Sequence, residues 1–180
     1  MENKSAHPQD YMRALKNMIK EDELEELLKV STPIFLFGPL MLPQMLKSVT
    51  DAQPSLDIAT NMTQACLPGY ELWVFEGADI PVVRASGKLG QSVDGLVVFG
   101  LSAEQRNWIY EFEAENAKHL TPVSVEICTR DGVLRTIDAA TFVWKGRMDG
   151  LVSTGAKSWK IDTFLQSELY QNATRKYSSS

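Results

Sequence analysis

The sequence predicts a single α+β domain in which helices cover the outside of a small barrel or strongly curved sheet. Roughly six or seven short strand-like segments, broken by Gly, Pro and Asp, are mixed with a few helical patterns. The two kinds do not alternate regularly, as they would in a doubly wound parallel sheet. The length of 180 residues is that of one ordinary domain, and no long linker rich in Pro, Gly or Ser divides the chain.

The charge and apolar pattern of the chain exclude two classes of partner. The formal net charge is −5 and the basic residues are scattered, with no run longer than Arg175 and Lys176, which argues against nucleic acid. No apolar stretch reaches the roughly 18 residues of a membrane-spanning helix, so no membrane partner is expected. Residues 1–10 are polar and lack the apolar centre of a signal peptide. We therefore expect a cytoplasmic protein.

The two cysteines, Cys66 and Cys128, are too few for a disulfide scaffold or for a metal site built from cysteine. Both lie in apolar stretches, and free cysteine is among the most buried residue types. We therefore predict two buried thiols.

The pattern divides the chain into a short tail and one domain. Residues 1–10 are expected to be a disordered tail, and residues 11–177 a single domain that begins with a helical extension at residues 11–32. Within the extension the apolar stripe changes phase, and Asp22 followed by Glu25 resembles a capping box, so the helix is expected to restart there.

Further elements follow from apolar periodicity and turn signals. Helices are predicted at residues 40–49, 102–112 and 161–176, with Ser102 as an N-cap. Asp131 and Gly132 predict a hairpin turn. Strands are predicted at residues 34–37, 65–75 with a bend at Pro68 and Gly69, 81–83, 93–99, 123–127, 133–137 and 139–144.

Five short motifs occur in a fixed order along most of the chain. They are FLFGPL at 35–40, LPGY at 67–70, IPVV at 80–83, VDGLV at 93–97 followed by GLS at 100–102, and IYEFE at 109–113. In this order and spacing the chain resembles the gamma-glutamyl cyclotransferase-like superfamily, which includes plant avirulence-induced proteins and their fungal relatives. The resemblance implies a small mixed β-barrel with flanking helices.

The same resemblance implies an activity and a site. A family enzyme releases 5-oxoproline from a gamma-glutamyl amine or peptide and needs no metal or organic cofactor. By resemblance Glu113 is the general acid/base, and the loop after the first strand binds the glutamyl part of a small-molecule substrate. The residues of that loop are Phe37, Gly38, Pro39, Leu40 and Met41.

The chemistry explains why such residues are needed. Attack by the substrate's own α-amine is intramolecular, so the protein mainly holds the folded-back conformation, while one carboxylate moves the proton. A strand, Gly38 and a helix start would present backbone N–H groups to a carboxylate or an oxyanion. Arg84 could pair with a substrate carboxylate if its side chain turned inward, although an exposed position is the simpler expectation. Without the resemblance, Gly38 with Pro39 would be a plain strand-ending turn, and Glu113 a solvated residue at a helix end.

Several positions depart from the family pattern. Phe37 replaces the motif tyrosine, Pro39 replaces a serine or threonine, Phe142 stands where relatives often have a tyrosine, and residues 115–120 contain no tyrosine. Two alternatives therefore stay open beside the enzyme. One is a non-catalytic ligand-binding or scaffold protein on the same fold, and the other is a different acyl-transfer or cyclisation enzyme of a specialised pathway. The sequence leaves the leaving group and the oligomeric state undetermined.

Overall fold

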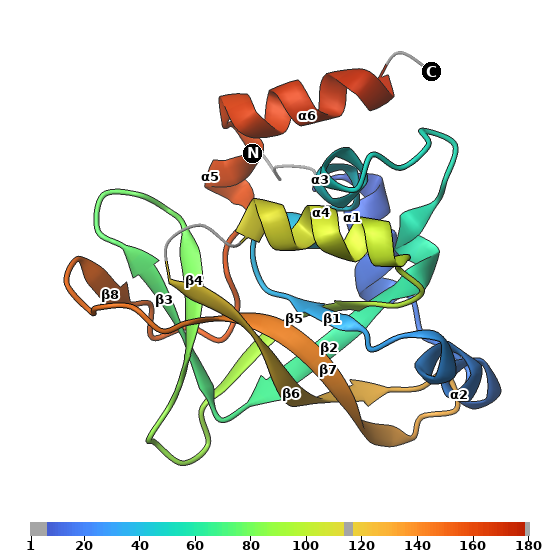
Figure 1. Cartoon of the computed structure of the whole chain (residues 1–180), viewed down its shortest axis with the longest axis horizontal. Helices are drawn as coiled ribbons and strands as arrows, with labels where there is room; N and C mark the ends of the chain where they lie inside the picture. The colour runs from blue at the N-terminus through green and yellow to red at the C-terminus, as the bar shows by residue number, and fades with distance from the viewer. Residues whose placement is uncertain (1–6, 114–116, 179–180) are drawn as a thin grey trace, which may run out of the picture.

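A computed structural model describes residues 7–113 and 117–178 and shows an α+β fold built on one sheet of eight strands. Five strands close into a barrel in the order β1, β5, β2, β6, β7 and back to β1 (Figure 1). Their bounds are β1 Ile34–Leu36, β2 Met62–Pro68, β5 Ser92–Val98, β6 Lys118–Cys128 and β7 Leu134–Trp144. The contact between β1 and β7 is parallel and the others are antiparallel, so the expected small mixed barrel is confirmed.

Strand β7 both closes the barrel and carries an extension of the sheet. Ala140 pairs with β1, and the buried hydroxyl of Thr141 donates to the carbonyl oxygen of Phe35 at 2.9 Å. Val143, further along the same strand, pairs with β4. The strands of the extension are β4 Pro81–Ala85, β3 Tyr70–Phe75 and β8 Leu151–Ser153.

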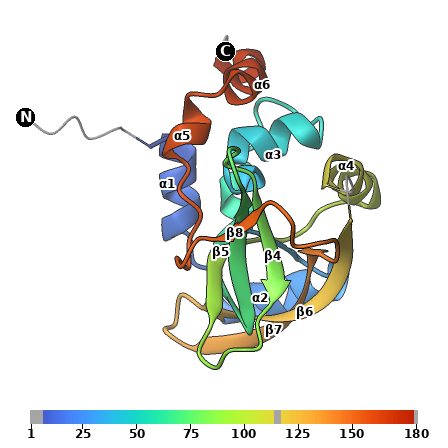
Figure 2. The same cartoon turned by 90° about the vertical axis from the view of Figure 1, so that its left-hand side faces the viewer.

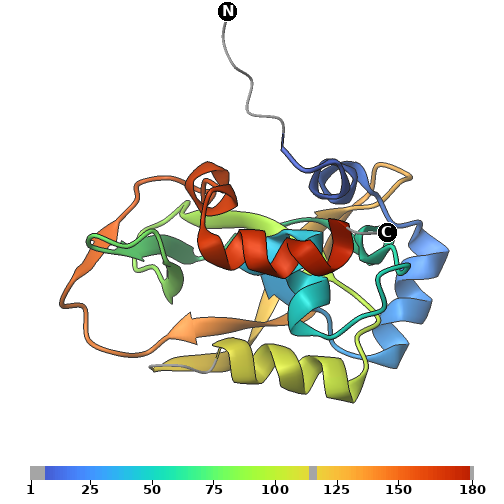
Figure 3. The same cartoon turned by 90° about the horizontal axis from the view of Figure 1, so that it is seen from above.

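Helices cover one side of the barrel and one of its ends. Figure 1 shows α3, α4, α5 and α6 on one side of the sheet, and α2 at the end away from β8. In Figure 2, α1 and α4 flank opposite sides, and seen from above α6 crosses over α3 (Figure 3). The bounds are α1 Gln9–Lys16, α2 Glu21–Val30, α3 Pro43–Val49, α4 Ala103–Glu113, α5 Asp162–Leu165 and α6 Glu168–Ser178, with short 3-10 turns η1 Pro39–Met41 and η2 Ile58–Asn61. None of the described helices combines the length and the hydropathy that crossing a bilayer would require.

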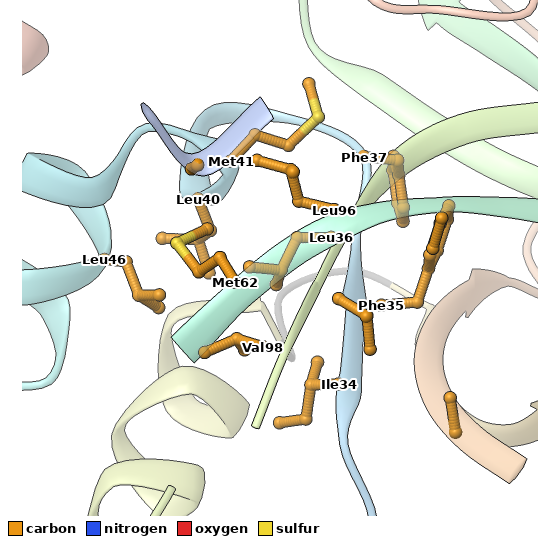
Figure 4. Packing of buried hydrophobic residues seen from close by; sticks show 14 of the residues in the cluster. Ile34, Phe35, Leu36, Phe37, Leu40, Met41, Leu46, Met62, Leu96 and Val98 are labelled. Carbon is orange, nitrogen blue, oxygen red and sulfur yellow. The ribbon is translucent and has the colours of Figure 1, made fainter. Parts of the chain in front are cut away.

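The core lies within the barrel and beneath α3. Figure 4 shows Phe35 and Leu36 of β1 beside Met62 of β2 and Leu96 of β5, all of them buried. Burying each such side chain contributes about 1.5–3 kcal/mol. Strand β1 reaches this depth because Gly95 faces it, and a Cβ at Gly95 would collide with the carbonyl oxygen of Leu36.

The helical patterns in the sequence are present in the structure, but all of them except the one at residues 102–112 are interrupted. The expected extension contains two helices, because α1 ends at Lys16 and α2 starts at Glu21, next to the predicted restart. Helix α1 itself begins at Gln9, inside the predicted tail, whose residues 1–6 lie outside the described part. The helix predicted at 40–49 divides into η1 and α3, and the last one divides into α5 and α6, where the Ser167 hydroxyl accepts from the Tyr170 N–H at 3.2 Å.

The strands were predicted more closely, with two corrections, and the burial of the cysteines needs a third. One continuous strand, β7 Leu134–Trp144, stands where two were predicted, and β8 was not predicted because its three residues carry no alternating pattern. The prediction of two buried thiols is wrong. Cys66 is half-buried and Cys128 is exposed, because both occupy outward positions of their strands while the neighbours Leu67 and Ile127 point inward.

Candidate functional site

A cavity of about 380 Å³ lies between the end of the barrel and the helices above it. Its walls come from segments far apart in the sequence. They are the turn after β1, the loop between β3 and β4, the last turn of α4, the first residue of β6, the last part of β7, and α5 with α6. The volume is within the usual range for a small-molecule site.

The turn after β1 forms one wall of this cavity, and Gly38 is its tightest point. A Cβ at this position would lie 2.8 Å from Cγ of Pro81 at the start of β4. Glycine is therefore needed here for the close approach of the turn to the ring of Pro81 rather than for a special φ angle, since its φ is −133°. Both residues line the cavity.

The backbone N–H groups of this turn are partly used by the turn itself. The N–H of Met41 donates to the carbonyl of Gly38 at 2.9 Å, and the N–H of Leu42 donates to that of Pro39 at 3.1 Å. Pro39 has no N–H. Within the described chain no hydrogen bond is found for the N–H of Gly38 or of Leu40. These two groups are therefore the donors that the turn can offer to a ligand.

Glu113 is brought to the cavity by helix α4. The helix starts with a reciprocal capping box, in which the N–H of Gln105 donates to the Ser102 hydroxyl at 3.1 Å and the N–H of Ser102 donates to the Gln105 side chain at 2.9 Å. The predicted N-cap is thus confirmed. The helix ends at Glu113, about three turns later, with that side chain in the cavity lining.

The carboxylate of Glu113 is mostly shielded from water and forms an ion pair with Lys118. The Lys118 Nζ lies 3.1 Å from Glu113 Oε2, and the two side chains are only 16% and 15% exposed. Among the described residues that line the cavity, Lys118 is the one cation. A shielded pair of this kind is held more firmly than a surface salt bridge, because its charges are less screened by water and ions.

The rest of the lining is largely apolar. Phe37 and Phe142 are buried at its inner part, and Phe142 is within ring contact of Tyr110, with centroids 6.1 Å apart. Phe164 of α5 lines it from above and packs against Trp159 at 5.6 Å. The two positions where the sequence departs from the family tyrosines therefore both face this cavity, which makes it less polar.

Asp79 joins the loop between β3 and β4 to the segment that carries Phe164. Its Oδ1 accepts a hydrogen bond from the indole N–H of the buried Trp159 at 3.0 Å. Asp79 also lines the cavity. The contact ties the β3–β4 loop to the segment just before α5, over a separation of 80 residues in the sequence.

Not every residue expected at the site reaches it. Phe37, Gly38, Pro39, Leu40 and Glu113 all line the cavity, whereas Met41 is buried outside the lining. Arg84 points elsewhere. Its guanidinium donates to the carbonyl of Gly146 at 3.4 Å and contacts the sulfur of Met148. Neither side chain is placed to touch a ligand in this cavity.

Sequence reasoning missed Lys118, Asp79 and Leu169 as site residues. Lys118 had a usable signal, since it follows the end of α4 and starts an alternating strand. Asp79 and Leu169 had none, because only the tertiary packing of the β3–β4 loop and of α6 brings them to the cavity that Glu113 lines.

A second cavity of about 560 Å³ is larger but differently built. Its charged groups are satisfied by the chain itself. Arg13 pairs with Asp57 at 2.9 Å, while the buried Lys47 donates to the carbonyl of Pro54 at 2.6 Å and lies 4.8 Å from the ring centre of Tyr177. These contacts tie α1, α3 and α6 together, which is a structural task.

A third groove, of about 370 Å³, contains both thiols. Cys66 pairs across the sheet with Asp94 on one side and Glu126 on the other, and Cys128 lies nearby. Within residues 7–113 and 117–178, however, no three His, Cys, Asp or Glu side chains are arranged to hold a metal ion.

The sequence that forms this cavity was compared with known proteins. The family model described as gamma-glutamyl cyclotransferase, AIG2-like, matches residues 34–161, which include the turn after β1, helix α4 and Lys118. A search of curated proteins found no match.

Solved structures share the fold at low sequence identity. The Arabidopsis thaliana protein At3g28950.1 is 20% identical, with 81% of this chain and 80% of that one covered and a TM-score of 0.53. A second Arabidopsis thaliana protein, At5g39720.1, is 18% identical, with 82% and 86% covered and a TM-score of 0.52. An AIG2-like protein from Mus musculus is 16% identical, with 73% and 89% covered and a TM-score of 0.50.

Proposed function

Because the chain belongs to the gamma-glutamyl cyclotransferase, AIG2-like family, we propose that it releases 5-oxoproline from a small gamma-glutamyl compound, with Glu113 as general acid and base. The observation that carries this proposal is the position of Glu113. Its shielded carboxylate lies in the wall of a ligand-sized cavity that also contains the turn at Gly38.

The proposed reaction moves protons between two nitrogen atoms of one substrate. Glu113 accepts a proton from the α-ammonium group, and the freed amine attacks the side-chain carbonyl carbon. A new C–N bond closes the five-membered ring, and the amide C–N bond to the leaving group breaks. Two ammonium protons are lost from the attacking nitrogen, and both end on the departing amine. No metal or organic cofactor takes part in these steps.

The turn after β1 supplies what the intramolecular attack needs. The N–H groups of Gly38 and Leu40 are the donors available for a substrate carboxylate or for the developing oxyanion. Holding the substrate folded back upon itself contributes much of the rate, because attack within one molecule can correspond to effective molarities of about 10⁵ M or more.

Lys118 positions the carboxylate and balances its charge. With Nζ 3.1 Å from Oε2, it restrains the Glu113 side chain at one edge and leaves Oε1 available for the proton transfer. We assign Lys118 as a positioning residue, and we leave Met41 and Arg84 outside the proposed site.

A binding protein without catalysis is the second candidate, and one observation favours it. Pro39 removes a donor from the turn, and Phe37 and Phe142 make the cavity less polar than a site built with tyrosines. Both candidates use the same cavity, so binding alone does not distinguish them.

Turnover distinguishes the two candidates. The protein is incubated with a panel of gamma-glutamyl amines and gamma-glutamyl amino acids, and 5-oxoproline is measured. We expect turnover of at least one compound, and a fall in kcat of about 10²–10⁴-fold for Glu113→Gln, which keeps the shape and removes the base.

The matched control is Glu104→Gln, at the exposed start of the same helix. It should leave kcat unchanged. Undiminished turnover in Glu113→Gln would refute the role of that carboxylate, and a panel in which compounds bind but none is turned over would favour the binding protein.

A further inference from the structure

The mouth of the site cavity is unusually apolar for a protein surface. Three large side chains line it while staying open to water: Ile80 is 50% exposed, Phe112 is 36% exposed and Leu169 is 53% exposed. They come from the loop between β3 and β4, from α4 and from α6. Single exposed apolar residues are ordinary, but several around one opening mark a place where a ligand covers them.

The inner and outer parts of the cavity differ in chemistry. The ion pair of Glu113 with Lys118 and the turn at Gly38 belong to the shielded part, where the Glu113 side chain is 16% exposed and Phe37 is buried. That part contains the groups a glutamyl moiety needs. Whatever is attached to the leaving nitrogen must therefore extend toward the mouth, against Phe112, Phe164 and Leu169.

The charges along this path are unfavourable for a second carboxylate. The one described cation in the lining, Lys118, is already paired with Glu113. The other two ionisable groups of the lining are Asp79 and Glu111, both carboxylates. A leaving amino acid would place its own carboxylate between apolar walls and without a cationic partner, which costs binding free energy.

Neither acidic side chain makes the mouth a strong site for a cation. Asp79 accepts from the indole of Trp159 at 3.0 Å, and Glu111 accepts from the amide of Asn107 at 3.2 Å. Both residues are exposed, so water and ions screen their attraction for an ammonium group.

We propose that the leaving group is a hydrophobic amine without a carboxylate, whose hydrocarbon covers Phe112, Phe164 and Leu169. This inference rests on the function proposed above and narrows it from gamma-glutamyl compounds in general to gamma-glutamyl amides of alkyl or aryl amines.

The test is a matched series of gamma-glutamyl amides. Lengthening the amine from methylamine to pentylamine should raise kcat/KM by about fourfold for each buried methylene. At the same chain length, pentylamine is compared with 5-aminopentanoate and with 1,5-diaminopentane. The pentylamine compound should exceed the carboxylate compound at least tenfold and should also exceed the diamine compound. A carboxylate or diamine compound that equals it would overturn the inference.

A pair of variants tests the place of the hydrocarbon. Leu169→Ser should lower kcat/KM for the pentylamine compound more than for the methylamine compound, so that the rise of kcat/KM with chain length becomes smaller. Val133→Ser, at the exposed tip of the β6–β7 hairpin, removes a similar side chain far from the cavity lining and should change neither. Equal responses to the chain length in wild type and Leu169→Ser would contradict the proposal.

Binding separates failure of this inference from failure of the proposed function. Calorimetry on Glu113→Gln compares the affinities of the pentylamine and 5-aminopentanoate compounds without turnover. Tighter binding of the pentylamine compound supports the apolar preference even if the wild type produces no 5-oxoproline. Turnover by the wild type with equal affinities in the variant refutes the preference and keeps the enzyme.

Discussion

Two cavities of this protein differ in how their charged groups are used. The larger one, about 560 Å³, contains Arg13 paired with Asp57 and Lys47 bound to a backbone carbonyl. The smaller one, about 380 Å³, holds Glu113 with one cation and an apolar wall. Volume alone would favour the cavity whose charged groups are already paired within the chain.

The two cavities differ in whether their charged and polar groups already have partners within the chain. In the larger cavity the chain supplies a partner for each cation, and the contacts hold α1, α3 and α6 together. In the smaller cavity the charged pair stands beside two free backbone donors and a mouth of exposed apolar side chains. Polar groups and apolar surface that a ligand could still contact are what distinguish a candidate ligand site from a structural cavity.

Adding one methyl group to the smaller cavity should give the largest effect. Gly38→Ala places a Cβ 2.8 Å from the Cγ of Pro81, so the turn and β4 must separate. We expect kcat/KM for the best gamma-glutamyl substrate to fall about a hundredfold, because a displacement of about 1 Å at a catalytic site has this cost.

Gly87→Ala is the matched control for this change. Gly87 has no atom near the added Cβ and no left-handed φ, and it lies in the turn before β5. The kcat/KM of Gly87→Ala should match that of the wild type. Gly38→Ala with full activity would show that the turn is not part of the working site.

Removing the cation of the larger cavity should affect stability and leave turnover intact. Lys47→Met keeps most of the hydrocarbon but loses the hydrogen bond to Pro54 and the contact with Tyr177. We expect the free energy of unfolding to fall by about 1.5–3 kcal/mol, the usual contribution of a hydrogen bond from a charged group.

Denaturant unfolding and steady-state kinetics on the same preparations measure both effects. Lys157→Met, on an exposed loop, should leave the stability within about 0.5 kcal/mol of the wild type. A loss of kcat in Lys47→Met at unchanged stability would instead assign a catalytic task to the larger cavity.

The smallest expected effect is a pH dependence of the free energy of unfolding that arises from Asp10, which lines the larger cavity. Burial raises the pKa of Asp10 above its ordinary value of 3.8, against the lowering effects of the Tyr11 N–H and Arg13. The folded state then binds protons more readily than the unfolded one. The stability of the wild type relative to Asp10→Asn should therefore rise as the pH falls from neutral through the raised pKa toward 3.8.

Asp51 provides a control of opposite sign. Its hydrogen bond with Lys176, at 2.7 Å, lowers the pKa of its carboxyl below 3.8. The stability of the wild type relative to Asp51→Asn should therefore be present above 3.8 and be lost as the pH falls through the lowered pKa. Thermal unfolding between pH 7 and pH 3 measures how the stability difference between wild type and each variant changes with pH. If that difference changes in the same direction for Asp10→Asn and Asp51→Asn, burial does not raise the pKa of Asp10.

Local sequence signals predicted the elements that present the site. Ser102 with Gln105 marked the start of α4, and periodicity carried that helix to within one residue of Glu113. The apolar run after Pro33 and the glycine at 38 likewise located β1 and its turn. These signals are readable because capping and turn chemistry act between residues a few positions apart.

Long-range contacts at the site could not be predicted from such local signals. Asp79 meets Trp159, and Leu169 reaches the mouth of the cavity, only because α5 and α6 fold back over the barrel. Arg84 is the reverse case: its charge would suit a substrate carboxylate if it turned inward, but its guanidinium lies at the carbonyl of Gly146. Which side of a strand faces a cavity depends on the register of the closed barrel, and that is a property of the whole sheet.

The amino-acid sequence by itself determined the order of the elements, the family motifs and the presence of an acidic residue at the end of α4, because each follows from interactions between near neighbours in the chain. Only the tertiary structure decided that this carboxylate is shielded, that Lys118 is its partner and that apolar side chains from three distant segments surround it. Shielding and charge pairing are set by what packs around a group, and here the packing comes from residues up to 134 positions apart, as where the same cavity is lined by Phe35 and Leu169.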